Sequence, residues 1–198
     1  MTKPKRSARN ICKRSAHQNF KLIEIEEQKK LTLTGLKQFY VDIQEDMKLK
    51  NLVSLLMDVQ YNQAFIFVKK VERAKKLHQL LEKMKLQVLT IHRQMTQERR
   101  IEQYKSFKEG AKRILVTTNL MARGIDINKV NLVINFDCPA GSDDYLHRVG
   151  RAGRFNTPGI AVTFVTTEED KKVLKEIQDR FEVKITEFPK NIEEAKLL

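Results

Sequence analysis

Apolar residues in this chain occur in two patterns that alternate from one segment to the next. Residues 64–68 are apolar without a break, which is typical of a strand buried on both faces. Residues 71–84 instead repeat apolar positions every three or four residues, as on one side of an amphipathic helix. The same reasoning predicts strands over 36–43, 64–68, 87–91, 113–117, 130–135 and 160–165, and helices over 48–59, 71–84, 96–107, 142–151 and 168–180.

Strands that alternate with helices in this way predict a parallel sheet covered by helices on both faces. Thr96 stands just before an expected helix and is a suitable N-cap, while Asp143 and Asp144 suit the first turn of another. No internal repeat is visible. We therefore expect a single α/β domain.

Composition adds a strong positive charge to this fold class. The 198 residues carry a net charge of +13, which points to an acidic partner, most simply nucleic acid. Cys12 and Cys138 are too few and too far apart for a zinc site or a disulfide framework, so we expect a reducing compartment. No apolar run approaches the length of a membrane span, and no secretory signal is visible.

Three arginines and a histidine are concentrated in residues 147–154. If this segment is helical, His147, Arg151 and Arg154 share one face. A guanidinium presents a rigid fork of donors that matches phosphate oxygens, so the segment is a candidate for binding a polyphosphate. The alternative is a solvated basic helix face.

Two glycines interrupt this basic segment. Gly150 and Gly153 would each cost about 1 kcal/mol relative to alanine in a helix interior, so local stability does not explain them. We infer that they leave room for another backbone or for a phosphate group.

A second candidate segment follows the expected strand 113–117. Ligands of open α/β sheets bind beyond the carboxyl ends of the strands, and Thr118, Gly124 and Asp126 belong to that loop. Asp126 can accept hydrogen bonds from ribose hydroxyls, and Thr118 can donate one to a nucleic-acid phosphate. The alternative is that Asp126 caps a turn, a common use of aspartate after glycine.

Together these segments resemble the C-terminal half of the DEAD-box RNA helicases. Residues 118–126 resemble helicase motif V, residues 147–154 resemble motif VI, and residues 64–68 resemble motif IV. Gln97 and Arg100 match the family's Gln-x-x-Arg element, and Phe107 follows at the expected distance. The resemblance extends over about residues 20 to 190.

Within that family, the chain is most similar to the ATPase of spliceosome assembly and mRNA export. Residues 31–36, 91–93 and 178–183 carry this similarity. Asn119 stands where the wider family usually has aspartate, and an asparagine at this position is similar to this subfamily. Gln94 stands where the family has glycine.

The resemblance implies a RecA-like fold and an ATP-dependent RNA helicase that works in the nucleus. Arg151 and Arg154 would act as arginine fingers on the phosphates of ATP. Gly124 and Asp126 would contact the nucleotide near its ribose. His147 and Arg148 would couple this domain to its partner domain.

The resemblance also implies a path for RNA, with contacts to consecutive phosphates from Lys69, Arg93, Gln97, Arg100 and Thr118. The implied partners are single-stranded or duplex RNA, an N-terminal RecA-like domain, and proteins of splicing or mRNA export. No membrane partner is expected.

Two motifs needed for ATP hydrolysis are missing from the sequence. No glycine is followed by Lys and then Ser or Thr, as a P-loop requires, and there is no Asp-Glu-Ala-Asp segment to hold magnesium. We expect ATP and Mg²⁺ to be held mainly by a separate N-terminal domain, no metal site in this chain, and no hydrolysis by the chain alone.

These considerations divide the chain into residues 1–20 and residues 21–198. The second part is the expected helicase C-terminal domain. The first carries a run of basic residues and is either a basic arm or a remnant of the preceding helicase domain. As an arm it would touch nucleic acid, serve as a nuclear-import signal, or remain a solvated tail.

Two other functions fit the same residues. One is a stand-alone RNA-binding or protein-docking module without ATPase activity. The other is the corresponding half of a DNA helicase, because preference for RNA depends on contacts to the 2′-hydroxyl that a sequence does not reveal.

Overall fold

The structure of the chain is a computed structural model, and it describes residues 35–119, 127, 129–153 and 158–189. Strands and helices alternate there, as the apolar pattern predicts. The strands are β1 (Leu36–Asp42), β2 (Gln63–Phe67), β3 (Val88–Ile91), β4 (Ile114–Thr117), β5 (Val130–Asn135), β6 (Gly159–Val165) and β7 (Thr186–Glu187). The helices are the short 3-10 helix η1 (Glu45–Met47), α2 (Lys48–Asp58), α3 (Val71–Lys83), α4 (Gln97–Glu109), α5 (Ser142–Val149) and α6 (Glu168–Phe181).

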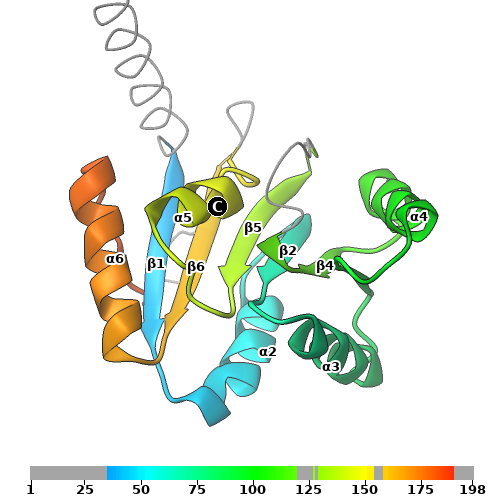
Figure 1. Cartoon of the computed structure of the whole chain (residues 1–198), viewed down its shortest axis with the longest axis horizontal. Coiled ribbons are helices and arrows are strands. Elements are labelled where there is room, and N and C mark those ends of the chain that lie inside the picture. The colour runs from blue at the N-terminus through cyan, green and yellow to red at the C-terminus, as the bar shows by residue number, and fades with distance from the viewer. Residues whose placement is uncertain (1–34, 120–126, 128, 154–157, 190–198) are drawn as a thin grey trace, which may run out of the picture. The chain divides into compact units, whose positions relative to one another are not determined.

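The strands of the described residues form one sheet in the order β3-β4-β2-β5-β6-β1-β7. Every neighbouring pair is parallel. The inner strands β2, β4 and β6 are buried along their whole length, which is typical of a parallel sheet with both faces covered. In Figure 1, β1, β6, β5, β2 and β4 follow one another across the domain, with α5 in front of β1 and β6. The predicted RecA-like α/β sheet is thus confirmed.

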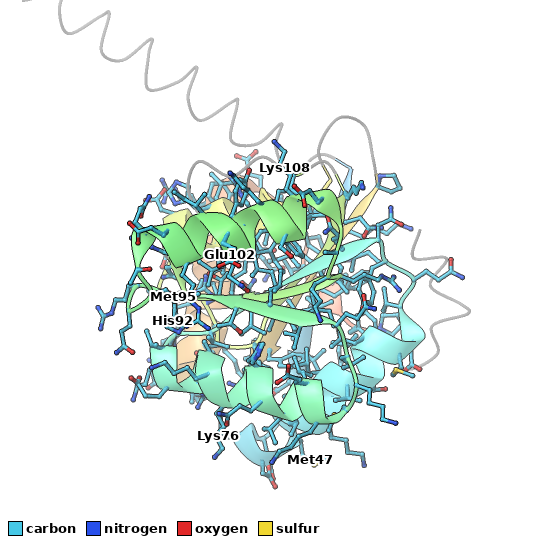
Figure 2. The ribbon with its side chains drawn as sticks, turned by 90° about the vertical axis from the view of Figure 1, so that its right-hand side faces the viewer. Met47, Lys76, His92, Met95, Glu102 and Lys108 are labelled. Carbon is cyan, nitrogen blue, oxygen red and sulfur yellow. The ribbon has the colours of Figure 1, made fainter. Side chains whose placement is uncertain are left out.

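The two faces of the sheet are covered by different helices, and Figure 2 shows the strands between α4 and α3. On the face of α2 and α3, Leu52 and Leu77 pack in one core with Ile134 of β5. On the other face, Phe107 of α4 meets Phe65 of β2 edge to face, with ring centroids 5.5 Å apart. Burial of such apolar surface is the main stabilising contribution to the domain.

Helix α5 is fixed to β1 by a buried polar contact. The Tyr145 hydroxyl donates a hydrogen bond of 2.7 Å to Oε1 of Gln38 in β1. Tyr145 is fully buried, so this bond satisfies a hydroxyl that would otherwise lack a partner. The contact sets the position of the helix that carries the basic segment.

The predicted starts of α4 and α5 are confirmed by their first residues. Thr96 Oγ1 accepts a hydrogen bond of 3.3 Å from the backbone N–H of Arg99. Asp143 and Asp144 occupy the first turn of α5, where negative charge is favourable. An N-cap bond of this kind satisfies one of the donors left unpaired at a helix start.

The basic segment is not helical over its described length, contrary to the interpretation of 147–154 as one helix. Helix α5 ends at Val149, and the backbone N–H of Arg151 bonds the carbonyl of Arg148 at 3.2 Å, as in a turn. His147 and Arg151 therefore do not share a helix face. Arg154 lies outside the described residues.

One glycine of the basic segment, Gly153, has a backbone explanation. Gly153 has φ of 69°, in the left-handed region that favours glycine. A Cβ on Gly159 would lie 2.6 Å from the backbone nitrogen of Gly153, so the backbone segments around these two residues approach each other closely. The room predicted at Gly153 is therefore used by another backbone.

Two elements were absent from the prediction. The strand β7 has two residues, both exposed, and forms only because it pairs with Phe39 and Tyr40 of β1. The helix η1 has three residues, none of them buried. Neither element is long enough to show a periodic apolar pattern.

We expect Gly159→Ala to lower the free energy of unfolding by about 2–3 kcal/mol, because its methyl group would overlap the backbone of Gly153. Gly141→Ala is the matched control: Gly141 has φ of 173°, and the nearest atom to an added Cβ, Oε1 of Glu176, is 4.0 Å away. The control should lose less than about 1 kcal/mol. Urea unfolding followed by circular dichroism measures both, and equal losses would contradict the close approach.

Candidate functional site

The predicted site residues follow the carboxyl ends of neighbouring strands. Lys69 comes two residues after β2, Arg93 two residues after β3, and Thr118 directly after β4. Because β2, β3 and β4 are parallel, these three positions belong to the same edge of the sheet. Ligands of open α/β sheets bind at this edge.

The basic segment reaches the same edge through Arg148 of α5. The guanidinium of Arg148 is fully buried and bonds acceptors that follow two different strands. Nε and Nη2 donate to Oδ1 of Asn119, just after β4, at 3.1 and 2.6 Å. Nη1 donates to Oδ1 of Asn135 at 3.3 Å and to the backbone carbonyl of Asp137 at 2.8 Å.

The fifth N–H of this guanidinium completes an ion pair. Nη2 of Arg148 lies 2.9 Å from Oδ2 of Asp144, one helical turn earlier on α5. The group also lies over the ring of Phe67, 5.4 Å from its centroid. Burial lowers the pKa of Arg148 and the charge of Asp144 opposes that shift, so the side chain remains a cation at neutral pH.

The role predicted for Arg148, coupling to a partner domain, stays a prediction. All five of its N–H donors are used within the domain, and its side chain is 0% exposed, so any such coupling acts through the groups that it holds. Arg148 holds the loop after β4 and the end of β5 against α5. It is a positioning residue.

Asp137 forms a second buried network at this edge and was not among the predicted residues. Its carboxylate accepts a hydrogen bond of 2.8 Å from the backbone N–H of Lys69 and pairs with Lys48 at 3.2 Å. Arg73 of α3 pairs with the same carboxylate. A carboxylate two residues after a buried strand is the sequence feature that could have identified it.

Arg151 and His147, the other predicted residues of the basic segment, are both half-buried. Nε of Arg151 donates a hydrogen bond of 3.2 Å to the backbone carbonyl of His147. Arg151 follows α5 and stands two residues before Gly153, whose backbone approaches Gly159 at the amino end of β6. Gly124, Asp126 and Arg154 lie outside the described residues.

The predicted RNA contacts differ in their exposure. Arg93 and Gln97 are exposed, and the side chain of Lys69 is 52% exposed with its Nζ 4.0 Å from Oδ1 of Asp170. Arg100 is half-buried, and its Nε is buried without a hydrogen-bond partner among the described residues. Thr118 is only 8% exposed, so it presents the smallest surface of the five.

Other chemistries find little support in this part of the chain. Among the described residues, no group of three or more His, Cys, Asp or Glu side chains could hold a metal ion. Burial raises the pKa of Cys138 to about 12, so its thiol is protonated at neutral pH and is a poor nucleophile. No described helix is long and apolar enough to cross a membrane.

Comparison with known proteins supports the helicase resemblance. The model of the helicase conserved C-terminal domain matches residues 47–156. The chain is 49% identical over 185 residues to ATP-dependent RNA helicase WM6 of Drosophila melanogaster, covering 93% of this chain and 43% of that protein. It is 50% identical over 181 residues to ATP-dependent RNA helicase SUB2 of Kluyveromyces lactis, covering 91% of this chain and 41% of that protein. The chain thus spans less than half the length of these relatives.

Solved structures give the same result for the fold. The C-terminal domain of the DEAD-box protein Dbp5 superposes with a TM-score of 0.75 at 32% identity, covering 82% of this chain and 96% of that domain. S. cerevisiae Dbp5 bound to RNA and ADP BeF3 gives a TM-score of 0.75 at 32% identity over 81% of this chain and 44% of that chain.

We expect Arg148→Met to lower the free energy of unfolding by about 3 kcal/mol, because it leaves Asp144 and the Asn119 carbonyl without their buried partner. Arg93→Met, at an exposed position after β3, is the control and should change stability by less than about 0.5 kcal/mol. Thermal and urea unfolding measure both variants. A small loss in Arg148→Met would show that the network does not hold the edge together.

Proposed function

The chain belongs to the helicase conserved C-terminal domain family, and we propose that residues 21–198 are the C-terminal RecA-like domain of an ATP-dependent DEAD-box RNA helicase. The observation that supports this proposal is that Lys69, Arg93 and Thr118 follow the carboxyl ends of three neighbouring parallel strands. The sequence identity to ATP-dependent RNA helicases supports it. Residues 1–20 are proposed to be a basic arm or the end of the preceding domain.

In this proposal, the domain supplies one wall of a cleft that closes on ATP. Arg151 and Arg154 stabilise the charge that develops on the γ-phosphate during hydrolysis. Positive groups of this kind act on the transition state without contributing a nucleophile. Gly124 and Asp126 contact the nucleotide near its ribose.

ATP and Mg²⁺ would be bound mainly by the other domain. Magnesium neutralises phosphate charge during phosphoryl transfer, and no described carboxylate cluster in this chain fits that role. The residues of this chain therefore contribute orientation and positive charge. His147, half-buried beside Arg151, couples the cleft to the partner domain.

RNA would lie along the ends of β2, β3 and β4. Lys69, Arg93, Gln97, Arg100 and Thr118 contact phosphates, of which the exposed Arg93 and Gln97 are the most accessible. Arg100 is half-buried and lies one helical turn after Gln97 on α4, so the two side chains are neighbours on that helix. Contacts to phosphate fix the position of a strand without reading its bases.

The cellular role follows from similarity to the splicing and export subfamily. We propose a nuclear helicase that acts on RNA with splicing or export proteins. The alternative is a stand-alone RNA-binding or protein-docking module without ATPase activity. The two differ in one property, since only the helicase domain would support RNA-stimulated hydrolysis when joined to an ATP-binding domain.

We expect Arg151→Ala to reduce RNA-stimulated ATP hydrolysis by about 10³-fold in a protein where this chain is joined to a DEAD-box N-terminal domain. Nucleotide binding should be largely kept, because the variant loses a contact made mainly in the transition state. A coupled ATPase assay and fluorescent-nucleotide binding measure the two properties. Lys172→Ala, exposed on α6, is the control and should retain full hydrolysis. Near-normal turnover by Arg151→Ala would contradict its role as an arginine finger.

The isolated chain should bind single-stranded RNA weakly, without sequence preference and with an affinity that falls as salt rises. Replacing Arg93 and Arg100 together by alanine should lower the slope of log affinity against log salt by about 1–2, because roughly one released counterion is lost per phosphate contact. Fluorescence anisotropy with oligouridylate at several salt concentrations measures the slope. An unchanged slope would place the RNA elsewhere on the domain, and tighter binding to DNA would favour a DNA helicase.

A further inference from the structure

Asp144, in the first turn of α5, joins three segments of the chain through one carboxylate oxygen. Its Oδ2 accepts hydrogen bonds from Nδ2 of Asn119 at 3.0 Å and from the backbone N–H of Ala140 at 3.2 Å. The same oxygen lies 2.9 Å from Nη2 of Arg148. These donors belong to the chain after β4, to the loop that precedes α5, and to the basic segment. Asp144 therefore connects the end of β4 to the helix that carries the basic segment.

Asn119 is oriented by two charged partners. Its Oδ1 accepts from Nε and Nη2 of Arg148 at 3.1 and 2.6 Å, while its Nδ2 donates to Asp144. A guanidinium only donates and a carboxylate only accepts, so the two partners admit a single orientation of the Asn119 amide. Asn119 is exposed, and water competes for its amide group. Hydrogen bonds to charged groups are about twice as strong as neutral ones and can hold such a residue in place.

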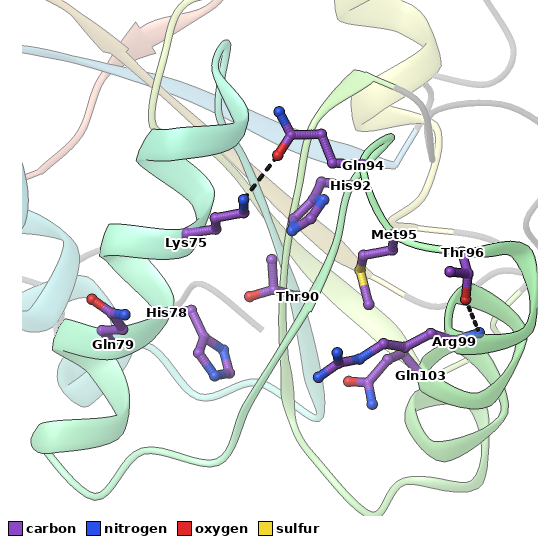
Figure 3. A pocket seen from close by; sticks show the side chains of 10 residues that line it. All are labelled: Lys75, His78, Gln79, Thr90, His92, Gln94, Met95, Thr96, Arg99 and Gln103. Atoms are coloured by element: carbon purple, nitrogen blue, oxygen red, sulfur yellow. Dashed lines mark hydrogen bonds between the residues drawn. The ribbon is translucent and has the colours of Figure 1, made fainter.

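Thr118, a proposed RNA contact, lies between Asn119 and a second fixed residue. Oγ1 of Thr117, the last residue of β4, donates a hydrogen bond of 2.9 Å to the carbonyl of Ile91 at the end of β3. From there the chain enters the loop of His92 and leads to α4, as Figure 3 shows. Thr118 is thus held to β3 on one side and to α5 on the other. With 8% of its surface exposed, it can contact a phosphate only if the chain around it keeps this position.

We propose that Asp144 is a positioning residue for RNA binding, which acts through Asn119 to hold Thr118 in its place on the RNA path. This inference rests on the proposed function and adds a residue to it. Asp144 does not contact RNA in this account. Its contribution is to keep the chain after β4 in the arrangement that binds RNA, so that the free energy of RNA binding is not spent on ordering that chain.

Replacing Asp144 by asparagine would leave more donors than acceptors around position 144. The Asn119 amide, the Ala140 N–H and Nη2 of Arg148 would all face the introduced amide, whose oxygen has two lone pairs. One of the three donors must then give up its bond. The exposed Asn119 is the donor that water satisfies most easily, so we expect Asp144→Asn to release Asn119.

Exchanging the two groups should restore the cluster. In the double variant Asn119→Asp with Asp144→Asn, the carboxylate at position 119 can accept from Arg148 and from the introduced amide. The oxygen of that amide can accept from the N–H of Ala140. Composition and net charge stay the same as in the unmodified chain. Asn119→Asp alone instead places two carboxylates together and removes the donor between them.

Binding of oligouridylate to the full chain, followed by fluorescence anisotropy at fixed salt, tests the proposal. Asp144→Asn should weaken binding by about threefold or more, because a smaller fraction of molecules holds Thr118 in the arrangement that binds RNA. A change in charge alone predicts the opposite result, since removing a carboxylate favours binding of a polyanion. The double variant should bind within about twofold of the unmodified chain.

Asp143→Asn is the matched control. It removes the same charge from the same turn of α5, at a side chain that is 62% exposed and lies 3.2 Å from Nη2 of Arg180. It should leave the affinity for oligouridylate unchanged or slightly increase it. Backbone amide spectra of all variants check that each one is folded.

The protein in which this chain is joined to a DEAD-box N-terminal domain gives a second readout. Asp144→Asn should raise the RNA concentration for half-maximal stimulation of ATP hydrolysis by about threefold or more. The rate at saturating RNA should change by less than about twofold, because bound RNA itself selects the correct arrangement. A variant that only lost folded protein would lower the saturated rate and leave the half-maximal RNA concentration unchanged.

Three results would overturn the inference and leave the proposed function standing. The first is that Asp144→Asn binds oligouridylate as tightly as the unmodified chain, or more tightly. The second is that the double variant binds no better than Asp144→Asn. The third is equal weakening by Asp143→Asn, which would indicate a general effect of the first turn of α5. Absence of RNA binding by the unmodified chain and of RNA-stimulated hydrolysis by the joined protein would instead remove the proposed function, and this inference with it.

Discussion

The buried guanidinium of Arg148 is the interaction on which the candidate site depends. Moving a cation out of water costs several kcal/mol unless acceptors replace the lost hydration. Here the acceptors come from Asn119 after β4, Asn135 and Asp137 at the end of β5, and Asp144 of α5. Satisfying this one group therefore requires two strand ends and one helix to take fixed relative positions. Arg151 follows the end of this helix, and its Nε donates to the carbonyl of His147.

Charges at this edge divide into those that hold the structure and those that remain available to a ligand. Asp137 joins Lys48, Arg73 and the backbone of Lys69, and its own carbonyl accepts from Arg148. These contacts neutralise most of the buried charge within the domain. The side chains of Lys69 and Arg93 at the strand ends are exposed instead and carry positive charge toward solvent. A rigid edge with outward positive charge is suited to bind phosphates of a long polyanion.

The main strands of the sheet could be predicted from the sequence alone, but the roles of individual arginines could not. Apolar runs and helical spacing located the main strands and helices because these patterns record which faces are buried. Arg148 and Arg151 are three residues apart and chemically identical, yet one is fully buried and the other half-buried. That difference depends on Asn119 and Asn135, which are distant in sequence and become neighbours only in the folded sheet. The end of α5 at Val149 depends on tertiary packing in the same way.

The same network explains why an asparagine suits position 119. Nδ2 of Asn119 donates a hydrogen bond of 3.0 Å to Oδ2 of Asp144, while its Oδ1 accepts from Arg148. An aspartate could still accept from the guanidinium, but it would place a second carboxylate against Asp144 and would lose the donor. Two carboxylates in contact repel unless one of them takes up a proton. An aspartate at this position would therefore lose one hydrogen bond and add a repulsion that the Arg148 guanidinium has to offset. The identity of residue 119 is thus coupled to that of residue 144 through a single guanidinium.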